Sequence, residues 1–203
     1  MPPDESLPTA PPTLVLASGS RYRRALLERL GLSFVQETPA VDETIAPGES
    51  PADAARRLAR AKARAVQARH PAAIVIGSDQ VAVRGDEILG KPGTPERAVQ
   101  QLTLSAGRHV EFLTAVCVLS GAQPDEPEEH IDITRVAFRP LTPVEIRNYV
   151  QRDTPEDCAG SFRAEGLGIA LFERIDSQDP TGLIGLPLIW LSQALRRLGM
   201  PVI

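Results

Sequence analysis

An acidic residue stands at the end of a strongly apolar segment, in the sequence IVIGSDQV at residues 74–81. The apolar run predicts a buried strand, and ligand sites in open α/β sheets commonly lie where such strands end. The carboxylate of Asp79 could hold a divalent cation or accept a proton from water, although a strand-end aspartate can also simply cap a turn. Lys91 follows in the sequence GKP. Its ammonium group suits a phosphate, although most single lysines are only solvated.

A second candidate is LASGSRYRR at residues 16–24, where small polar residues and three arginines mark the passage from a strand to a helix. Backbone N–H groups, hydroxyls and guanidinium groups at a helix start can bind phosphate oxygens. The same residues equally fit a capped helix with solvated arginines. The segment is not the GxxxxGK[ST] phosphate-binding loop.

Two further segments carry polar groups that could reach a ligand. The carboxylates of Asp42 and Glu43 could support a metal ion near Lys62 on the following helix, although acidic loops are common. In CAGSFRAEGLGI at residues 158–169, small residues allow close approach of the backbone to a ligand, and Glu165 could bind the edge of a nucleobase. The alternative for this segment is a glycine-flanked loop between strands.

Composition excludes several classes of protein. The 203 residues are 42% hydrophobic and 24% charged, as in an ordinary globular protein, and the net charge of −4 argues against a protein that coats nucleic acid. Cys117 and Cys158 lie far apart without CxxC spacing, which predicts reduced thiols and no structural zinc site. The three histidines show no pattern of a nucleophilic triad, and no GxSxG sequence is present. The first twelve residues lack the features of a secretory signal, and the apolar window 183–191 is too short to span a membrane, so we expect a cytoplasmic protein.

Alternating strand and helix signals predict an α/β fold, with a tail at residues 1–12 and a single domain at 13–203. A helix should follow SGSR and end at Gly31. The polar, acidic segment 121–130 predicts a solvated loop. Further helices are expected at residues 51–70, 95–106, 142–151 and 187–198, and strands at 13–17, 33–35, 73–76, 81–83, 88–89, 110–119, 131–138, around 161, and at 168–172.

In order and spacing, these motifs resemble the Maf family over about residues 13–200. The matching segments are LASGSRYRRALL, VDET, Ala61 with Lys62, IGSDQV, GKP, the strand containing Thr114, CAGSFRAEGLGI and GLPL. Within that family, three features are similar to the branch that hydrolyses 7-methyl-GTP: the SDQ sequence, the CAGS loop that ends in Glu-Gly, and the Asp-Pro before GLPL. Members that act on dTTP and UTP typically carry Asp-Thr where this chain has Asp79 and Gln80.

The resemblance implies a two-lobed α/β fold similar to that of inosine triphosphatases, with a mixed, twisted sheet flanked by helices and an active cleft between the lobes. It implies hydrolysis of a nucleoside triphosphate to a monophosphate and pyrophosphate with a divalent metal such as Mg²⁺ or Mn²⁺. Carried onto this chain, it makes Asp79 the proton acceptor and, with Glu43, a metal ligand. It assigns the phosphates to Ser18, Arg23, Lys62 and Lys91, and the choice of base to Tyr22, Gln80 and Glu165. Tyr22 replaces the tryptophan expected in close relatives, and Gly19 and Arg21 also differ from the commoner residues.

Two other functions remain open from the sequence. The same hydrolysis could act on dTTP, UTP or other non-standard nucleotides. Alternatively, a non-enzymatic protein could use the arginine-rich helix at residues 56–64 to bind nucleic acid or a cell-division partner, because the family has been linked to septum inhibition. The acidic net charge argues against this second function. We therefore expect a nucleoside triphosphate as the partner, no stable binding to nucleic acid or membrane, and a chain compatible with a homodimer.

Overall fold

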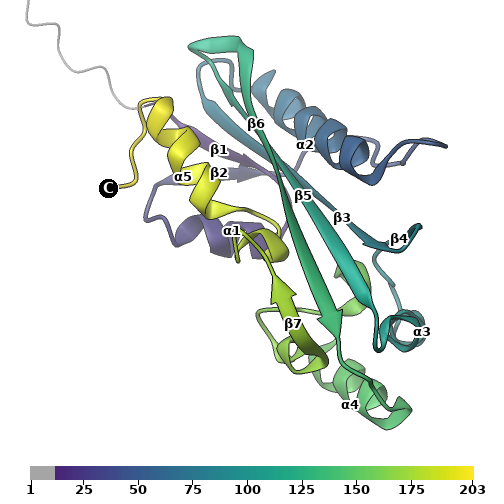
Figure 1. The fold of residues 1–203 in the computed structure, drawn as a ribbon. Coiled ribbons are helices and arrows are strands. Elements are labelled where there is room, and N and C mark those ends of the chain that lie inside the picture. The colour runs from purple at the N-terminus through teal and green to yellow at the C-terminus, as the bar shows by residue number, and fades with distance from the viewer. Residues whose placement is uncertain (1–11) are drawn as a thin grey trace, which may run out of the picture.

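The computed structural model describes residues 12–203, which fold as a mixed seven-stranded sheet flanked by helices (Figure 1). The tail predicted at residues 1–12 therefore lies outside the described residues, apart from its last position. The strand order is β2-β1-β3-β5-β6-β7, and β4 pairs with β3. The strands are β1 Leu14–Ala17, β2 Phe34–Glu37, β3 Ile74–Arg84, β4 Glu87–Leu89, β5 His109–Ser120, β6 Gln123–Phe138 and β7 Phe172–Asp176.

Within residues 12–203, five α-helices and three short 3₁₀ helices surround the sheet. The α-helices are α1 Arg21–Glu28, α2 Pro51–Gln67, α3 Pro95–Ser105, α4 Pro143–Asp153 and α5 Leu188–Arg197. The 3₁₀ helices are η1 Ala159–Ser161, η2 Leu167–Leu171 and η3 Gly182–Ile184. No helix in this part of the chain has the length and apolar content needed to cross a membrane.

The long strands β3, β5 and β6 run through two lobes, which confirms the predicted two-lobed α/β fold (Figure 1). In the first lobe, α2 packs on one face of the sheet while α1 and α5 pack on the other. In the second lobe, α3 and α4 pack on the far ends of β5 and β6 around Phe112 and Phe138. Both lobes therefore share the same three strands but have separate apolar cores.

The helix starts follow directly from the sequence. At α2 the Ser50 hydroxyl accepts a hydrogen bond from the backbone N–H of Asp53, and Pro51 occupies the first turn. At α4 Thr142 and Glu145 form a reciprocal capping box. Each of these capping interactions satisfies N–H groups that the first turn of a helix leaves free. The predicted starts of both helices are confirmed.

One edge of β3 is interrupted in its middle. β1 pairs in parallel with residues 74–77, and β4 pairs with residues 82–84, while β5 occupies the opposite edge along almost the whole strand. Residues 78–81 therefore have no strand partner on the edge that β1 and β4 share. Because side chains alternate across a strand, this four-residue gap exposes groups from both faces of the sheet to the same space.

Four sequence predictions of local structure are wrong. Asp79 does not follow the end of a strand, because β3 continues without a break from Ile74 to Arg84, where separate strands were expected at 73–76 and 81–83.

Residues 121–130 are not a solvated loop: the chain turns at Gly121 and Ala122 and continues as β6 from Gln123. Ion pairs with distant arginines stabilise this polar strand, Glu128 with Arg197 at 2.7 Å and Glu129 with Arg60 at 2.5 Å. Such partners could not be identified from local composition.

The strand expected around Ser161 is instead the 3₁₀ helix η1. Gly160 and Ser161 both have positive φ angles, 75° and 63°, which a strand does not accommodate. The strand expected at 168–172 is also displaced: η2 occupies Leu167–Leu171, and β7 begins at Phe172.

Candidate active site

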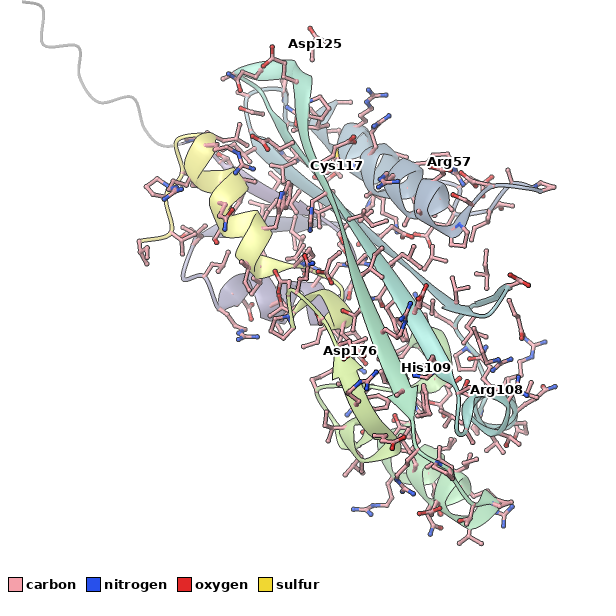
Figure 2. All side chains as sticks on the ribbon, in the orientation of Figure 1. Arg57, Arg108, His109, Cys117, Asp125 and Asp176 are labelled. Atoms are coloured by element: carbon pink, nitrogen blue, oxygen red, sulfur yellow. The ribbon has the colours of Figure 1, made fainter. Side chains whose placement is uncertain are left out.

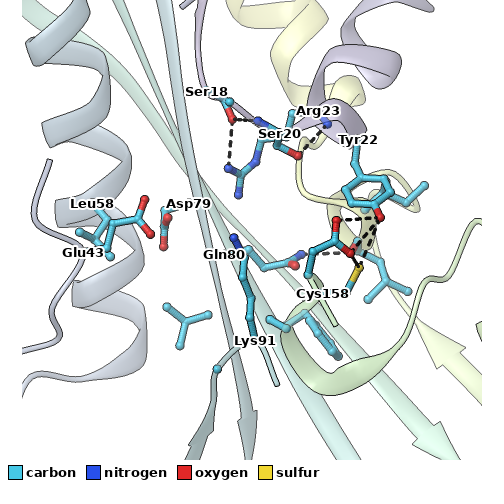
Figure 3. Close-up of a pocket in the computed structure, with 18 of the residues that line it drawn as sticks. Ser18, Ser20, Tyr22, Arg23, Glu43, Leu58, Asp79, Gln80, Lys91 and Cys158 are labelled. Atoms are coloured by element: carbon cyan, nitrogen blue, oxygen red, sulfur yellow. Dashed lines mark hydrogen bonds between the residues drawn. The ribbon is translucent and has the colours of Figure 1, made fainter. Parts of the chain in front are cut away.

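A cavity of about 810 Å³ lies at the gap in the edge of β3, between the two lobes (Figure 3). The structure places all nine sequence-predicted site residues on its wall. They are Ser18, Tyr22, Arg23, Glu43, Lys62, Asp79, Gln80, Lys91 and Glu165. Their proximity is a structural observation, whereas their individual roles stay predictions.

A buried lysine joins two acidic residues at one side of this cavity. Lys62 on α2 has its ammonium nitrogen 2.6 Å from Asp79 Oδ1 and 2.6 Å from Glu43 Oε1. Lys62 and Asp79 are 6% and 8% exposed, whereas 59% of the Glu43 side chain is exposed. One cation thus faces two carboxylates, and one of the two acids remains open to solvent.

Close packing of α2 on β3 brings these groups together. Gly77 lies two residues before Asp79 on the same face of the strand. A Cβ atom added to Gly77 would lie 2.2 Å from the carbonyl oxygen of Ala59 and 2.6 Å from the backbone nitrogen of Ala63. Only glycine therefore allows the helix to approach closely enough for Lys62 to reach Asp79.

The charges around Glu43 favour its ionised form. Burial alone would raise the pKa of this carboxyl group, but Lys62, with Lys91 and Arg23 nearby, holds the pKa below its usual value. The exposed Lys91 follows β4 and faces the same cavity. The ionised Glu43 thus lies beside the basic side chains of Lys62, Lys91 and Arg23.

The loop from β1 to α1 adds a second group of polar atoms. Arg23 donates from Nε to the carbonyl oxygen of Gly185 at 2.9 Å and from Nη1 to Ser18 Oγ at 3.4 Å. A guanidinium group has five N–H donors, so three of the five on Arg23 remain available to a phosphate. Burial lowers the pKa of Arg23, partly offset by Asp79 and Glu43, yet an arginine stays charged in proteins.

Two hydrogen bonds hold the same loop in place. The Ser20 hydroxyl caps α1 by accepting from the backbone N–H of Arg23, and Gln36 on β2 donates to the carbonyl oxygen of Ser18 at 2.7 Å. The N-terminus of α1 therefore faces the cavity with free N–H groups and a positive dipole end. Gln36 is a supporting residue that the sequence motifs did not single out.

The acidic side chains fit a divalent cation that binds together with substrate. Among residues 12–203 no group of three or more histidine, cysteine or acidic side chains is arranged to hold a metal ion by itself. Mg²⁺ commonly binds through only one or two carboxylates, with water and substrate phosphates completing its shell. Glu43 and Asp79 supply two such carboxylates, and the two lie close together because Lys62 binds one oxygen of each.

The opposite end of the cavity is built differently. Tyr22 donates from its hydroxyl to Asp157 at 3.2 Å and accepts from Arg21 at 2.6 Å, and the Cys158 thiol lies 3.7 Å away (Figure 3). Burial raises the pKa of Tyr22 to about 12, although the bond from Arg21 opposes this. These contacts link α1 in the first lobe to the loop after α4 in the second. Glu165 is exposed at this end.

Asp157 and Cys158 also line the cavity; Cys158 begins the candidate segment at residues 158–169, whereas sequence reasoning passed over Asp157. The one available signal was the position of Asp157 directly before the CAGS sequence. Asp179 and the GLIGLPL segment that follows it have a structural role. The Asp179 carboxylate accepts from the backbone N–H groups of Thr181 and Ile189, and so anchors the start of α5.

The chain is similar to a known protein family and to proteins of named activity. The family model for Maf-like proteins matches residues 13–198. A 7-methyl-GTP pyrophosphatase from Nitrosococcus oceani is 52% identical over 96% of this chain and 97% of its own length. A second 7-methyl-GTP pyrophosphatase, from Burkholderia thailandensis, is 54% identical over 94% of this chain and 90% of its own.

A solved structure supports the fold independently of close sequence similarity. A HAM1 protein from Coxiella burnetii superposes with a TM-score of 0.52, covering 92% of this chain and 99% of that chain. The two sequences are only 16% identical, so the likeness concerns the fold alone.

Proposed function

Because the chain belongs to the Maf family, we propose that it is a nucleoside triphosphate pyrophosphatase that converts 7-methyl-GTP to 7-methyl-GMP and pyrophosphate. The observation that carries the proposal is the identity of more than half of the residues, over nearly the full length, to proteins named for that activity. The cavity supports it with acidic and basic groups suited to a triphosphate.

In this proposal the phosphates bind at the first-lobe end of the cavity. The free N–H groups of Arg23, the start of α1 and the ammonium groups of Lys62 and Lys91 would neutralise charge that builds up on the departing pyrophosphate. Glu43 and Asp79 would hold a divalent cation, which when bound supplies further neutralisation of the phosphate oxygens.

Asp79 is proposed to orient and deprotonate the attacking water. Lys62 binds Oδ1 of its carboxylate, and no residue among 12–203 donates a hydrogen bond to Oδ2. The second oxygen is therefore available to a water molecule or a cation. A general base must lie within hydrogen-bond reach of the proton that it removes, and a carboxylate fixed on a central strand meets that requirement without a large movement.

The nucleobase is proposed to bind at the other end, near Tyr22, Gln80 and Glu165. Methylation at N7 gives the guanine ring a positive charge and leaves N1–H and the 2-amino group as donors. The Glu165 carboxylate can accept from both, and the positive ring strengthens these bonds. Tyr22 could add a cation–π contact of roughly 0.5 to 2 kcal/mol.

The arginines of α2 give little support to nucleic-acid binding. Arg57 binds both carboxylate oxygens of Glu49, and Arg60 binds both of Glu129, so their charges are largely neutralised within the chain (Figure 2 labels Arg57). An electrostatic surface for phosphate backbones needs basic groups that are free to contact them.

A panel of nucleotides tests the proposed function. Purified protein should be incubated with 7-methyl-GTP, GTP, dTTP and UTP in Mg²⁺ or Mn²⁺, and monophosphate, diphosphate, pyrophosphate and orthophosphate should be quantified. We expect pyrophosphate as the product, a requirement for the cation, and the highest kcat/KM for 7-methyl-GTP. Diphosphate with orthophosphate would contradict the bond assigned, and equal or better use of dTTP would contradict the substrate. A salt-sensitive gel shift without any turnover would favour the non-enzymatic alternative.

A further inference from the structure

The side-chain nitrogen of Gln80 is surrounded by acceptors. It donates to Thr114 Oγ1 at 2.9 Å and to the carbonyl oxygens of Gly182 and Leu183, both at 3.1 Å. A primary amide has two N–H groups, so these three acceptors use its full donor capacity. Within residues 12–203, no group donates a hydrogen bond to the Gln80 side-chain oxygen.

Thr114 makes this orientation the only consistent one. Its hydroxyl donates to the Gly182 carbonyl oxygen at 2.9 Å, and a carbonyl oxygen can only accept. The single proton of the hydroxyl is therefore committed, and the hydroxyl oxygen can only accept from Gln80. A rotated amide would place its oxygen against two carbonyl oxygens and a lone pair of the hydroxyl, leaving all of them unsatisfied.

The acceptors are themselves held in place. Thr114 is fully buried on β5, opposite Gln80 in the β3–β5 ladder. Gly182 packs so closely on the buried Asp132 that an added Cβ would lie 2.2 Å from its carboxylate, and the Gly182 N–H donates to the Asp179 carbonyl oxygen at 2.9 Å. The η3 carbonyls therefore cannot turn away from Gln80 without disturbing several other contacts.

We infer that Thr114 is a positioning residue that fixes the Gln80 amide with its oxygen toward the cavity. At the end of the cavity proposed to bind the nucleobase, called the base end below, Gln80 and Glu165 then both present hydrogen-bond acceptors and no donor. The orientation follows from the contacts, whereas its meaning for substrate choice rests on the proposed function. An edge with two adjacent donors, such as N1–H and the 2-amino group of 7-methylguanine, matches these acceptors. Uracil and thymine present carbonyl oxygens on both sides of their single N–H and are disfavoured.

The orientation can be tested without any nucleotide. In ¹⁵N-labelled protein, the Gln80 side-chain amide is assigned by its loss in Gln80→Leu, and its proton exchange with water is compared with that of the exposed Gln193. We expect the Gln80 amide to exchange much more slowly in the wild type and in Thr114→Ser, and faster in Thr114→Val. Exchange at the Gln193 rate in the wild type would overturn the inference.

The effect on substrate choice is measured with the same variants. We expect Thr114→Val to lower the ratio of kcat/KM for 7-methyl-GTP over UTP about fivefold, mainly through a higher KM for 7-methyl-GTP, because one hydrogen bond no longer holds the amide. Thr114→Ser should keep the ratio, since it keeps the hydroxyl. An unchanged ratio in Thr114→Val, or an equal loss in both variants, would refute the positioning role. A wild type that does not favour 7-methyl-GTP would refute the proposed function, while amide exchange would still decide the orientation.

Discussion

The two ends of the cavity differ in how their side chains are held. At the phosphate end, Lys62 and Asp79 are buried on a helix and a central strand and bind one another directly. At the base end, Asp157 and Glu165 are exposed on the segment after α4, which contains only short 3₁₀ helices. Positions on regular, buried elements are more rigid than positions on loops. We therefore expect substitutions at the phosphate end to affect turnover and stability, and those at the base end to affect selectivity.

The largest effect is expected for Asp79→Asn. The amide keeps the shape of the side chain but cannot accept the proton of water, so kcat should fall about a hundredfold or more. Turnover of 7-methyl-GTP is measured after circular dichroism has shown that the fold is intact. Near-normal turnover would give Asp79 a structural role only and would remove the main distinction between the two ends.

Lys62→Met should destabilise the protein as well as inactivate it. The change leaves two carboxylates facing one another without their cation, and breaking a buried pair typically costs about 3 kcal/mol or more. The free energy of unfolding is measured in urea. Arg56→Met on the same helix is the matched control, because Arg56 and its partner Asp53 are both largely exposed, and it should change stability little. Equal losses in both variants would argue against the special position of Lys62.

Glu165→Gln should mainly alter selectivity. The amide removes a charge that strengthens bonds to the cationic ring, so kcat/KM for 7-methyl-GTP should fall about tenfold while that for UTP changes little. Steady-state rates on both nucleotides measure the ratio. A parallel loss on both would show that Glu165 acts on the phosphates or on the fold rather than on the base.

The smallest effect is expected for Tyr22→Phe, which keeps the ring but loses the bond to Asp157. The KM for 7-methyl-GTP should rise about threefold, within the range for one exposed hydrogen bond. An unchanged KM would limit Tyr22 to a contact through its ring, and a large fall in kcat would contradict the assignment of Tyr22 to the base end.

The same variant tests the ionisation of Tyr22. With its pKa raised to about 12, the folded protein holds the phenol proton more tightly than the unfolded chain does. The resulting stabilisation is complete below pH 10, the ordinary pKa, and is lost as the pH rises toward 12. Tyrosinate absorbance of the wild type minus that of Tyr22→Phe follows this group, because Tyr149 is the only other tyrosine in the chain. A midpoint near pH 10 would contradict the prediction.

Sequence reasoning located the elements and the site where local signals are strong. Ser50 with Pro51 predicts the start of α2, and the apolar run before Asp79 predicts the first part of β3 but not its continuation to Arg84. Reasoning from the residues alone placed Glu43 near Lys62 but could not bring Lys62 to Asp79, because α2 and β3 meet only through the tertiary packing at Gly77. It was the order of motifs, through the family resemblance, that placed Lys62 and Asp79 in one site.

Failures of prediction arise where distant contacts override composition. The polar start of β6 is a strand because β5 pairs with it and because Arg60 and Arg197 bind its glutamates. The positive φ angles of Gly160 and Ser161 occur where Gly160 packs closely on Phe112, which would lie 3.0 Å from an added Cβ, a contact between residues far apart in sequence. The contacts of Thr114 with Gln80 and Gly182 likewise form only in the folded protein, because these three residues lie on β5, β3 and η3.

The contact between α2 and β3 at Gly77 also determines how the gene should tolerate mutation. Every replacement of this glycine adds a Cβ against the backbone of Ala59 and Ala63, and so pushes away the helix that carries Lys62. In a saturation library selected for activity, position 77 should therefore accept no alternative residue and should group with Lys62 and Asp79. A residue without a side chain would then have the mutational profile of a catalytic one.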